Sequence, residues 1–168
     1  MTTLRTSIAF DLAAKFTSAL DLQTGSAPLN LSRSFSWGDG TAAESANRVW
    51  SDRRTLAASA TEDLDLAGVL TDAFGTAITF AKVRALIVAA SSGNTNNVLL
   101  GGVSAGLSTI IQPAATGIVV VRPGGLVAFI APDTTGYAVT ATTADLLHVA
   151  NSAGSTSVTY DIAIVGTA

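Results

Sequence analysis

The chain has 168 residues, a formal net charge of −3 and no cysteine; 48% of its residues are hydrophobic and only 12% are charged. Without cysteine there is no disulfide framework or thiolate chemistry, and without a basic stripe nucleic acid is a poor partner. No run of about 20 apolar residues is present, so we expect no membrane insertion. We instead expect the apolar excess to be covered by other copies of the chain or by partners.

Residues 7–37 carry a two-residue hydrophobic alternation that changes register once. The apolar positions are even in the first half and odd in the second: Ile8, Phe10, Leu12, Ala14, Phe16, Leu20 and Leu22, then Leu29, Leu31, Phe35 and Trp37. Residues 23–28 between them (QTGSAP) are turn formers, so the pattern predicts a long β-hairpin with one apolar face. Apolar residues also recur every four positions over residues 12–20, which keeps a helix there as the alternative.

From Arg48 onward, short apolar segments alternate with turn signals. The expected strands are 48–57, 61–66, 77–90 (whole or broken in its middle), 97–102, 108–111, 117–122, 126–131, 137–140, 145–150 and 156–165. Residues 66–72 have room for one helical turn at most. Such closely spaced strands predict an all-β fold, an antiparallel, jelly-roll-like β-sandwich preceded by the long N-terminal β-hairpin. We divide the chain into an arm with its connection, residues 1–46, and a sandwich domain, residues 47–168.

One short motif raises the question of a catalytic serine. Residues 102–106 read G-x-S-x-G around Ser104, and Asp133 or Asp145 and then His148 follow in the order used by α/β-hydrolases. That motif needs a helix after the serine, and residues 107–116 are rich in β-branched side chains and contain a proline. We therefore interpret Ser104 as a turn residue and expect no catalytic residue here.

The remaining titratable groups suggest no metal or cofactor site. His148 is the only histidine, so a histidine-based zinc site cannot be assembled, and we interpret it as a strand residue. Asp63 and Asp65 share one face of an expected strand, a spacing that calcium or a glycosidase acid pair could use. A solvated strand face is the interpretation we prefer, so we expect no cofactor and no metal.

A carbohydrate site is the main functional alternative to a structural role. Trp50 is large enough to stack on a sugar, and polar loops at residues 91–97 and 133–137 could add hydrogen bonds. The candidate ligand contacts are Trp50, Asn94, Asn96 and Tyr137. They would make the chain a module that binds carbohydrate on a cell surface.

The segment WSDRRTLAASATEDLDLAGVLTDAFGTAITFAKVRALIVAASSGN, residues 50–94, resembles small structural proteins of tailed-bacteriophage virions. The ending STSVTYDIAIVGTA is similar to the closing strand of such proteins, so the resemblance covers residues 47–168. It implies a β-sandwich subunit built into a capsid surface, a tail or a fibre attachment, used in repeated copies. It implies no catalytic residue, and the opening hairpin lies outside it. We expect capsid decoration, a spike base or a tail as the place of this chain, and the alternative is a module of a phage spike or tail that binds host-surface carbohydrate.

We therefore expect a non-enzymatic virion structural protein, made in the bacterial cytoplasm, whose partners are other virion proteins. We also expect a homo-oligomer, with a trimer favoured. Residues 4–37 would form an arm that adds to a neighbouring subunit, and its candidate interface residues are Phe10, Phe16, Phe35 and Trp37. Head or tail location, copy number and any host receptor stay open.

Overall fold

The computed structural model describes residues 3–68 and 70–168, and every regular element in them is a β-strand. In chain order the strands are β1 (Thr6–Ala19), β2 (Thr24–Asp39), β3 (Ser45–Ala46), β4 (Arg48–Leu56), β5 (Thr61–Asp65), β6 (Leu70–Thr71), β7 (Ala77–Ile78), β8 (Lys82–Ala90), β9 (Val98–Gly101), β10 (Ile118–Val121), β11 (Leu126–Ile130), β12 (Tyr137–Ala138), β13 (Leu146–Asn151) and β14 (Val158–Thr167). The all-β prediction is confirmed. No helix within the described ranges is long and apolar enough to cross a membrane.

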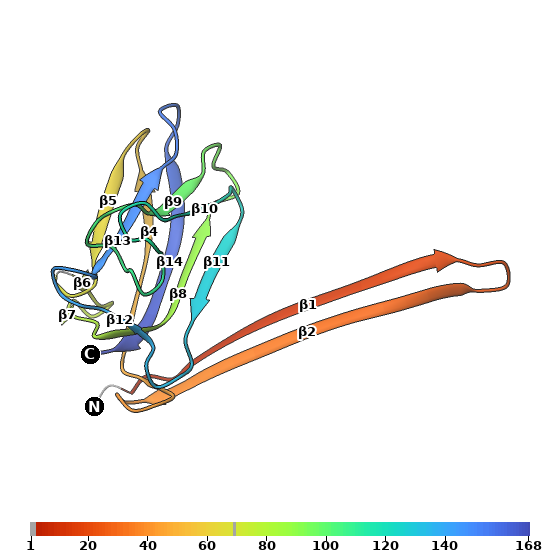
Figure 1. The fold of residues 1–168 in the computed structure, drawn as a ribbon, viewed down its shortest axis with the longest axis horizontal. Coiled ribbons are helices and arrows are strands. Elements are labelled where there is room, and N and C mark those ends of the chain that lie inside the picture. The colour runs from red at the N-terminus through yellow and green to blue at the C-terminus, as the bar shows by residue number, and fades with distance from the viewer. Residues whose placement is uncertain (1–2, 69) are drawn as a thin grey trace.

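Two antiparallel sheets form a sandwich (Figure 1). The four-stranded sheet has the order β10-β9-β13-β5; the five-stranded sheet has the order β11-β8-β14-β4, with β12 pairing to β8. In β14, Val158, Tyr160, Ile162 and Ile164 are buried between the sheets, as the alternation in residues 156–165 predicts. Their partners in the same core include Leu100 of β9 and Val149 of β13, which are fully buried.

Strands β1 and β2 form the predicted hairpin, called the arm from here on (residues 6–39). In Figure 1 it leaves the end of the sandwich where the C-terminus lies and extends far beyond it. The pairing joins Ile8 to Phe35 and Leu12 to Leu31, so the even apolar positions of β1 and the odd ones of β2 share one face. The helical alternative for residues 12–20 is wrong, since these residues continue the strand into the turn.

The turn of the arm lies earlier than predicted. It comprises Leu20–Gln23, closed by a hydrogen bond from the Leu20 N–H to the Gln23 carbonyl oxygen (2.8 Å), whereas residues 24–28 belong to β2. A turn centred at 25–26 would also have paired even with odd positions. The alternation therefore fixes which face is apolar, while the residue-by-residue register depends on contacts elsewhere.

Those contacts are at the base of the arm. Trp37, 3% exposed, packs with Phe35 and Ile8 against Ala85 and Val165, which are on the outer face of the five-stranded sheet. This small cluster is separate from the core between the sheets. It fixes the end of the arm to the sandwich by apolar contact.

A buried arginine holds the connection beside the base. Arg84 of β8 is the extra residue where the β8–β14 pairing shifts register, and its side chain is fully buried. Its guanidinium donates to the carbonyl oxygens of Ala42, Ser45 and Asp133. One side chain thereby ties the loop after the arm and the loop after β11 to the sheet.

A few expected elements differ. Residues 108–111 form turns, in which the Ile110 and Ile111 N–H groups both donate to the Leu107 carbonyl oxygen. The segment 77–90 is broken, as one of the two expectations had it. The two-residue strands β3 and β6 were not predicted, and Val69, within the expected turn at 66–72, lies outside the described residues.

Candidate functional site

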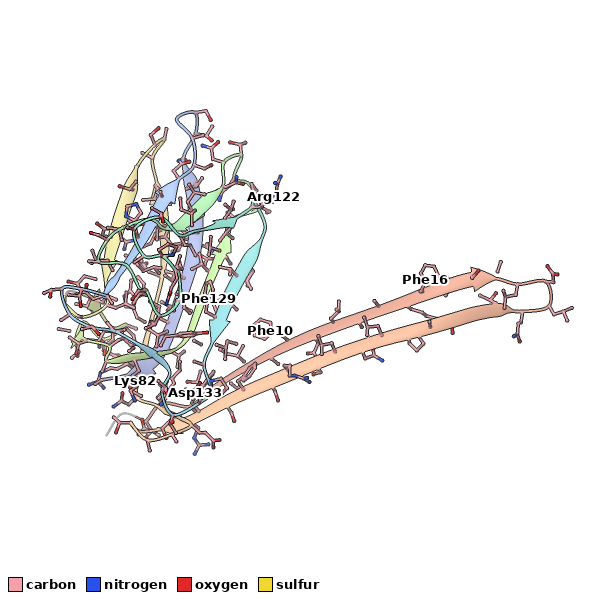
Figure 2. The ribbon with its side chains drawn as sticks, viewed as in Figure 1. Phe10, Phe16, Lys82, Arg122, Phe129 and Asp133 are labelled. Atoms are coloured by element: carbon pink, nitrogen blue, oxygen red, sulfur yellow. The ribbon has the colours of Figure 1, made fainter. Side chains whose placement is uncertain are left out.

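The apolar face of the arm is exposed along most of its length. Of its exposed large side chains the least exposed, Phe10 at 36%, lies nearest the base, and the most exposed, Leu22 at 98%, lies in the turn; Phe16 is 76% exposed. Figure 2 shows Phe10 and Phe16 on the side of the arm that faces the sandwich. Leu29 and Leu31 of β2 complete this surface. No apolar residue in the described ranges covers it beyond the base cluster.

The four candidate interface residues therefore have different settings. Phe10 and Phe16 project from the free part of the arm. Phe35 is half-buried and stacks on Trp37, with ring centroids 6.4 Å apart and planes 17° from parallel. Because Trp37 is buried in the base cluster, its role in the structure is to anchor the arm.

The outer face of the five-stranded sheet is a second apolar surface. The strand registers align its outward side chains in three rows across β4, β14, β8 and β11. From the base upward the rows are Val49–Val165–Ala85–Ile130, Ser51–Ala163–Ile87–Ala128 and Arg53–Asp161–Ala89–Leu126. The first row lies next to the base of the arm, and the two upper rows are left uncovered. We call these two rows the sheet face.

A shallow, open depression occupies the middle of the sheet face. Its lining includes Ser51, Ile87, Ala89 and Ala163, and small side chains make its floor. At its rim, the Arg53 guanidinium donates two hydrogen bonds to the Asp161 carboxylate, at 2.6 and 2.8 Å. This hydrogen-bonded pair lowers the pKa of Asp161 and raises that of Arg53. Both side chains are exposed, so the pair is a polar edge on an otherwise apolar surface.

The residues considered for catalysis are not assembled into one site. Ser104 is exposed in a turn that is followed by further turns and no helix, so the nucleophile elbow is absent. The His148 ring nitrogen Nδ1 lies 2.5 Å from an oxygen of Asp63, its cross-strand neighbour in the four-stranded sheet. Asp65 instead accepts a hydrogen bond from the Ala67 N–H. No group of three or more potential metal ligands exists in residues 3–68 and 70–168.

The residues considered for sugar binding do not form one site. Trp50 is 7% exposed and belongs to the core. The Asn94 side chain pairs with the Thr159 backbone, and Asn96 is buried in its loop. Tyr137 pairs with Val83 at the other end of β8, so roughly 27 Å of strand separates it from the asparagine loop. The fold does not bring these four side chains together.

One polar cluster has no counterpart in the sequence analysis. The buried Tyr160 hydroxyl donates to Glu62 at 2.7 Å, and Arg54 donates to the other oxygen of Glu62 at 2.6 Å. Burial, and then the bond to Glu62, raises the pKa of Tyr160. The hydrogen bond to Glu62 raises the pKa of Arg54. The cluster joins β14 and β4 of one sheet to β5 of the other, so its role is to close the open edge of the sandwich.

Comparisons of the chain with protein-family models, with curated proteins and with solved structures found no match.

Proposed function

We propose that this chain is a non-enzymatic structural subunit of a virion that assembles with other subunits through its arm. The observation that carries the proposal is the exposed apolar face of the arm, which extends beyond the sandwich while its base is fixed to it.

The energetics of the arm support an assembly role. A two-stranded ribbon alone in water is marginally stable, because nothing packs on its apolar face and it has no third strand. Exposed leucine and phenylalanine side chains gain free energy only when a partner covers them. The outer edges of β1 and β2 also keep free backbone N–H and C=O groups along most of their length. A partner that covers the face stabilises both the arm and the assembly.

The virion setting is supported by the resemblance of residues 47–168 to structural proteins of tailed-bacteriophage virions. Within this setting the chain would decorate a capsid, form a spike base or belong to a tail, with other virion proteins as partners. The scattered positions of Trp50 and Tyr137 give the carbohydrate-binding alternative no supporting geometry.

The test is incorporation into particles. Particles would be purified from a culture that produces this chain, and peptides of the chain would be sought in them by mass spectrometry. A second, tagged copy would carry a shortened arm in which Asn-Gly replaces residues 11–32 and joins the directly opposed Phe10 and Arg33. We expect the tagged full-length copy in the particles and the shortened one in the supernatant. Absence of the chain from particles contradicts the proposal.

A matched pair of variants tests whether incorporation depends on the apolar side chains of the arm or only on its length. Leu12→Asp with Leu31→Asp alters a cross-strand pair on the apolar face, whereas Ala13→Asp with Asn30→Asp alters the next pair, on the polar face. We expect only the first pair to reduce incorporation. Equal incorporation of both would show that the apolar face is not used.

A further inference from the structure

We infer that the sheet face of one copy receives the arm of a second copy of this chain. This inference rests on the proposed function, because it names the partner of the arm. The proposed contact joins two different surfaces: one copy contributes the apolar face of its arm, and the other contributes its sheet face.

The first argument is continuity with a contact that already exists. The base of the arm packs its apolar face on the lowest row of the same sheet, with Phe35 and Ile8 beside Ala85 and Val165. The sheet face is the upward continuation of that row across the same four strands. A second arm lying on it would repeat, between copies, the packing seen within one copy.

The second argument is shape. The arm face carries large side chains on a narrow ribbon, and Phe16 is the most exposed of its strand residues. In the middle row of the sheet the small side chains Ser51, Ala163 and Ala128 flank Ile87, and a shallow depression lies there. Two β layers pack well when large side chains on one meet small ones on the other. We therefore place Phe16, or a neighbouring large side chain of the arm, over that depression.

The third argument is area. The exposed apolar side chains of the arm and its tip offer on the order of 700 Å², more than the roughly 300–600 Å² of the largest patch on a typical monomer. One partner contributes roughly 800 Å² to a standard interface. An arm laid on a sheet thus supplies about one side of a stable contact. The same contact buries apolar surface on both the arm and the sheet face.

Charge favours this contact over a bundle of parallel arms. The apolar face has one charged member, Arg33, paired across the ribbon with Phe10. Parallel arms around a common axis would gather one Arg33 from each copy and leave them without an acidic partner on that face. On the sheet face the two charged side chains, Arg53 and Asp161, neutralise one another, so an arriving Arg33 meets no net positive charge there.

A contact between two different surfaces is head-to-tail, so it builds a ring if its rotation closes, and a chain of subunits if it does not. The trimer expected from the sequence is one such ring. An arm and a sheet face on the same molecule are sufficient for this kind of assembly.

The experiment measures the mass of the purified full-length chain by light scattering at micromolar concentration, then mixes two variants. Phe16→Lys alters the arm, and Ser51→Arg alters the sheet face; both positions are exposed, so folding should be retained. We expect the unaltered chain to be oligomeric and each variant alone to have the mass of one chain. An equimolar mixture should recover a species of two chains, because one intact arm then meets one intact sheet face.

Controls use neighbours on the opposite surfaces. Thr17→Lys changes the polar face of the arm, and Thr61→Arg changes the outer face of the other sheet; neither should alter the mass. Ala128→Arg, at the other end of the middle row, repeats the test of the sheet face with a second variant. Circular dichroism confirms that each variant is folded.

Three outcomes would overturn the inference. A monomeric unaltered chain shows that the arm waits for a different protein, and particle incorporation would then still support the proposed function. An oligomer that Ser51→Arg and Ala128→Arg leave intact shows that the sheet face is not the receiver. Monomeric variants whose mixture stays monomeric show that an intact arm on one copy does not bind an intact sheet face on another.

Discussion

The arm and the sandwich are built from the same two-residue alternation, but they differ in where the apolar side chains end up. In β14 of the sandwich, Tyr160 and Ile162 are buried by the facing sheet of the same chain. In β1 of the arm, Leu12 and Phe16 lie on an equally regular strand and have no facing sheet. The comparison shows that a clean amphipathic strand specifies a face to be covered and leaves open which molecule covers it.

The largest expected effect is a truncation in the sandwich core. Leu100→Ala removes a fully buried side chain between the two sheets. The lost burial and the remaining cavity should lower the free energy of unfolding by about 2–5 kcal/mol. Urea unfolding followed by circular dichroism measures the change, and a loss under 1 kcal/mol would mean that this core relaxes around the gap.

A smaller effect is expected at the hydrogen-bonded cluster of Tyr160, Glu62 and Arg54. Tyr160→Phe removes the hydroxyl that donates to Glu62 and should lower the free energy of unfolding by about 1–2 kcal/mol near pH 7. The folded chain holds the phenol neutral above pH 10, whereas the unfolded chain ionises near pH 10, so this stabilisation is complete below that pH and is lost as the pH rises beyond it.

Unfolding at several pH values from 8 to 11 checks the sign. The unaltered chain should lose stability above about pH 10 more steeply than Tyr160→Phe does. Tyr137, whose pKa is also raised by burial, leaves some slope in both proteins. Parallel slopes would mean that Tyr160 ionises as readily in the folded as in the unfolded chain.

The smallest effect on unfolding is expected on the arm, with the same leucine-to-alanine change. Leu12→Ala removes a side chain that is already half exposed, and the sandwich should keep its free energy of unfolding within about 0.5 kcal/mol. The proposed oligomer should become weaker instead. On dilution, light scattering should show that the variant dissociates at a higher protein concentration than the unaltered chain does. A large loss of sandwich stability would mean that the arm and the sandwich unfold as one unit.

Much of the fold is readable from the sequence because local alternation sets it. The apolar residues of β1, β2 and β14 repeat every second position, which predicts both the arm and the last core strand. The turn was predicted at residues 23–28 because glycine and proline gather there, but the true turn, Leu20–Gln23, contains neither. The base contacts of Trp37 with Ala85 and Val165 help to fix the register, and they are distant in sequence.

The proposed surfaces differ in how far they could be predicted. Phe10 and Phe16 follow from the alternation alone, since they fall on the apolar side of any hairpin. The sheet face depends on which strands are neighbours, because Ser51, Ala163 and Ile87 become one row only through pairing. A weak signal exists in the small, uncharged residues of the second half of the chain. Trp50 shows the limit of predicting from side-chain size alone. Its large ring suggests a ligand contact, but in the structure it is packed in the core.

The anchoring of the arm has a consequence for the order of synthesis. The arm leaves the ribosome early, but its base is held by Val165, and the Asn47 side chain beside it accepts a hydrogen bond from the Ala168 N–H, 121 residues away. During translation the arm therefore exists before its contact with Val165 and the hydrogen bond between Asn47 and Ala168 can form. A chain that ends before these residues would carry the arm and its exposed apolar face, but the arm would not be held in a fixed direction. On the proposed function, only a chain with a finished sandwich would present its arm to a partner in a fixed direction.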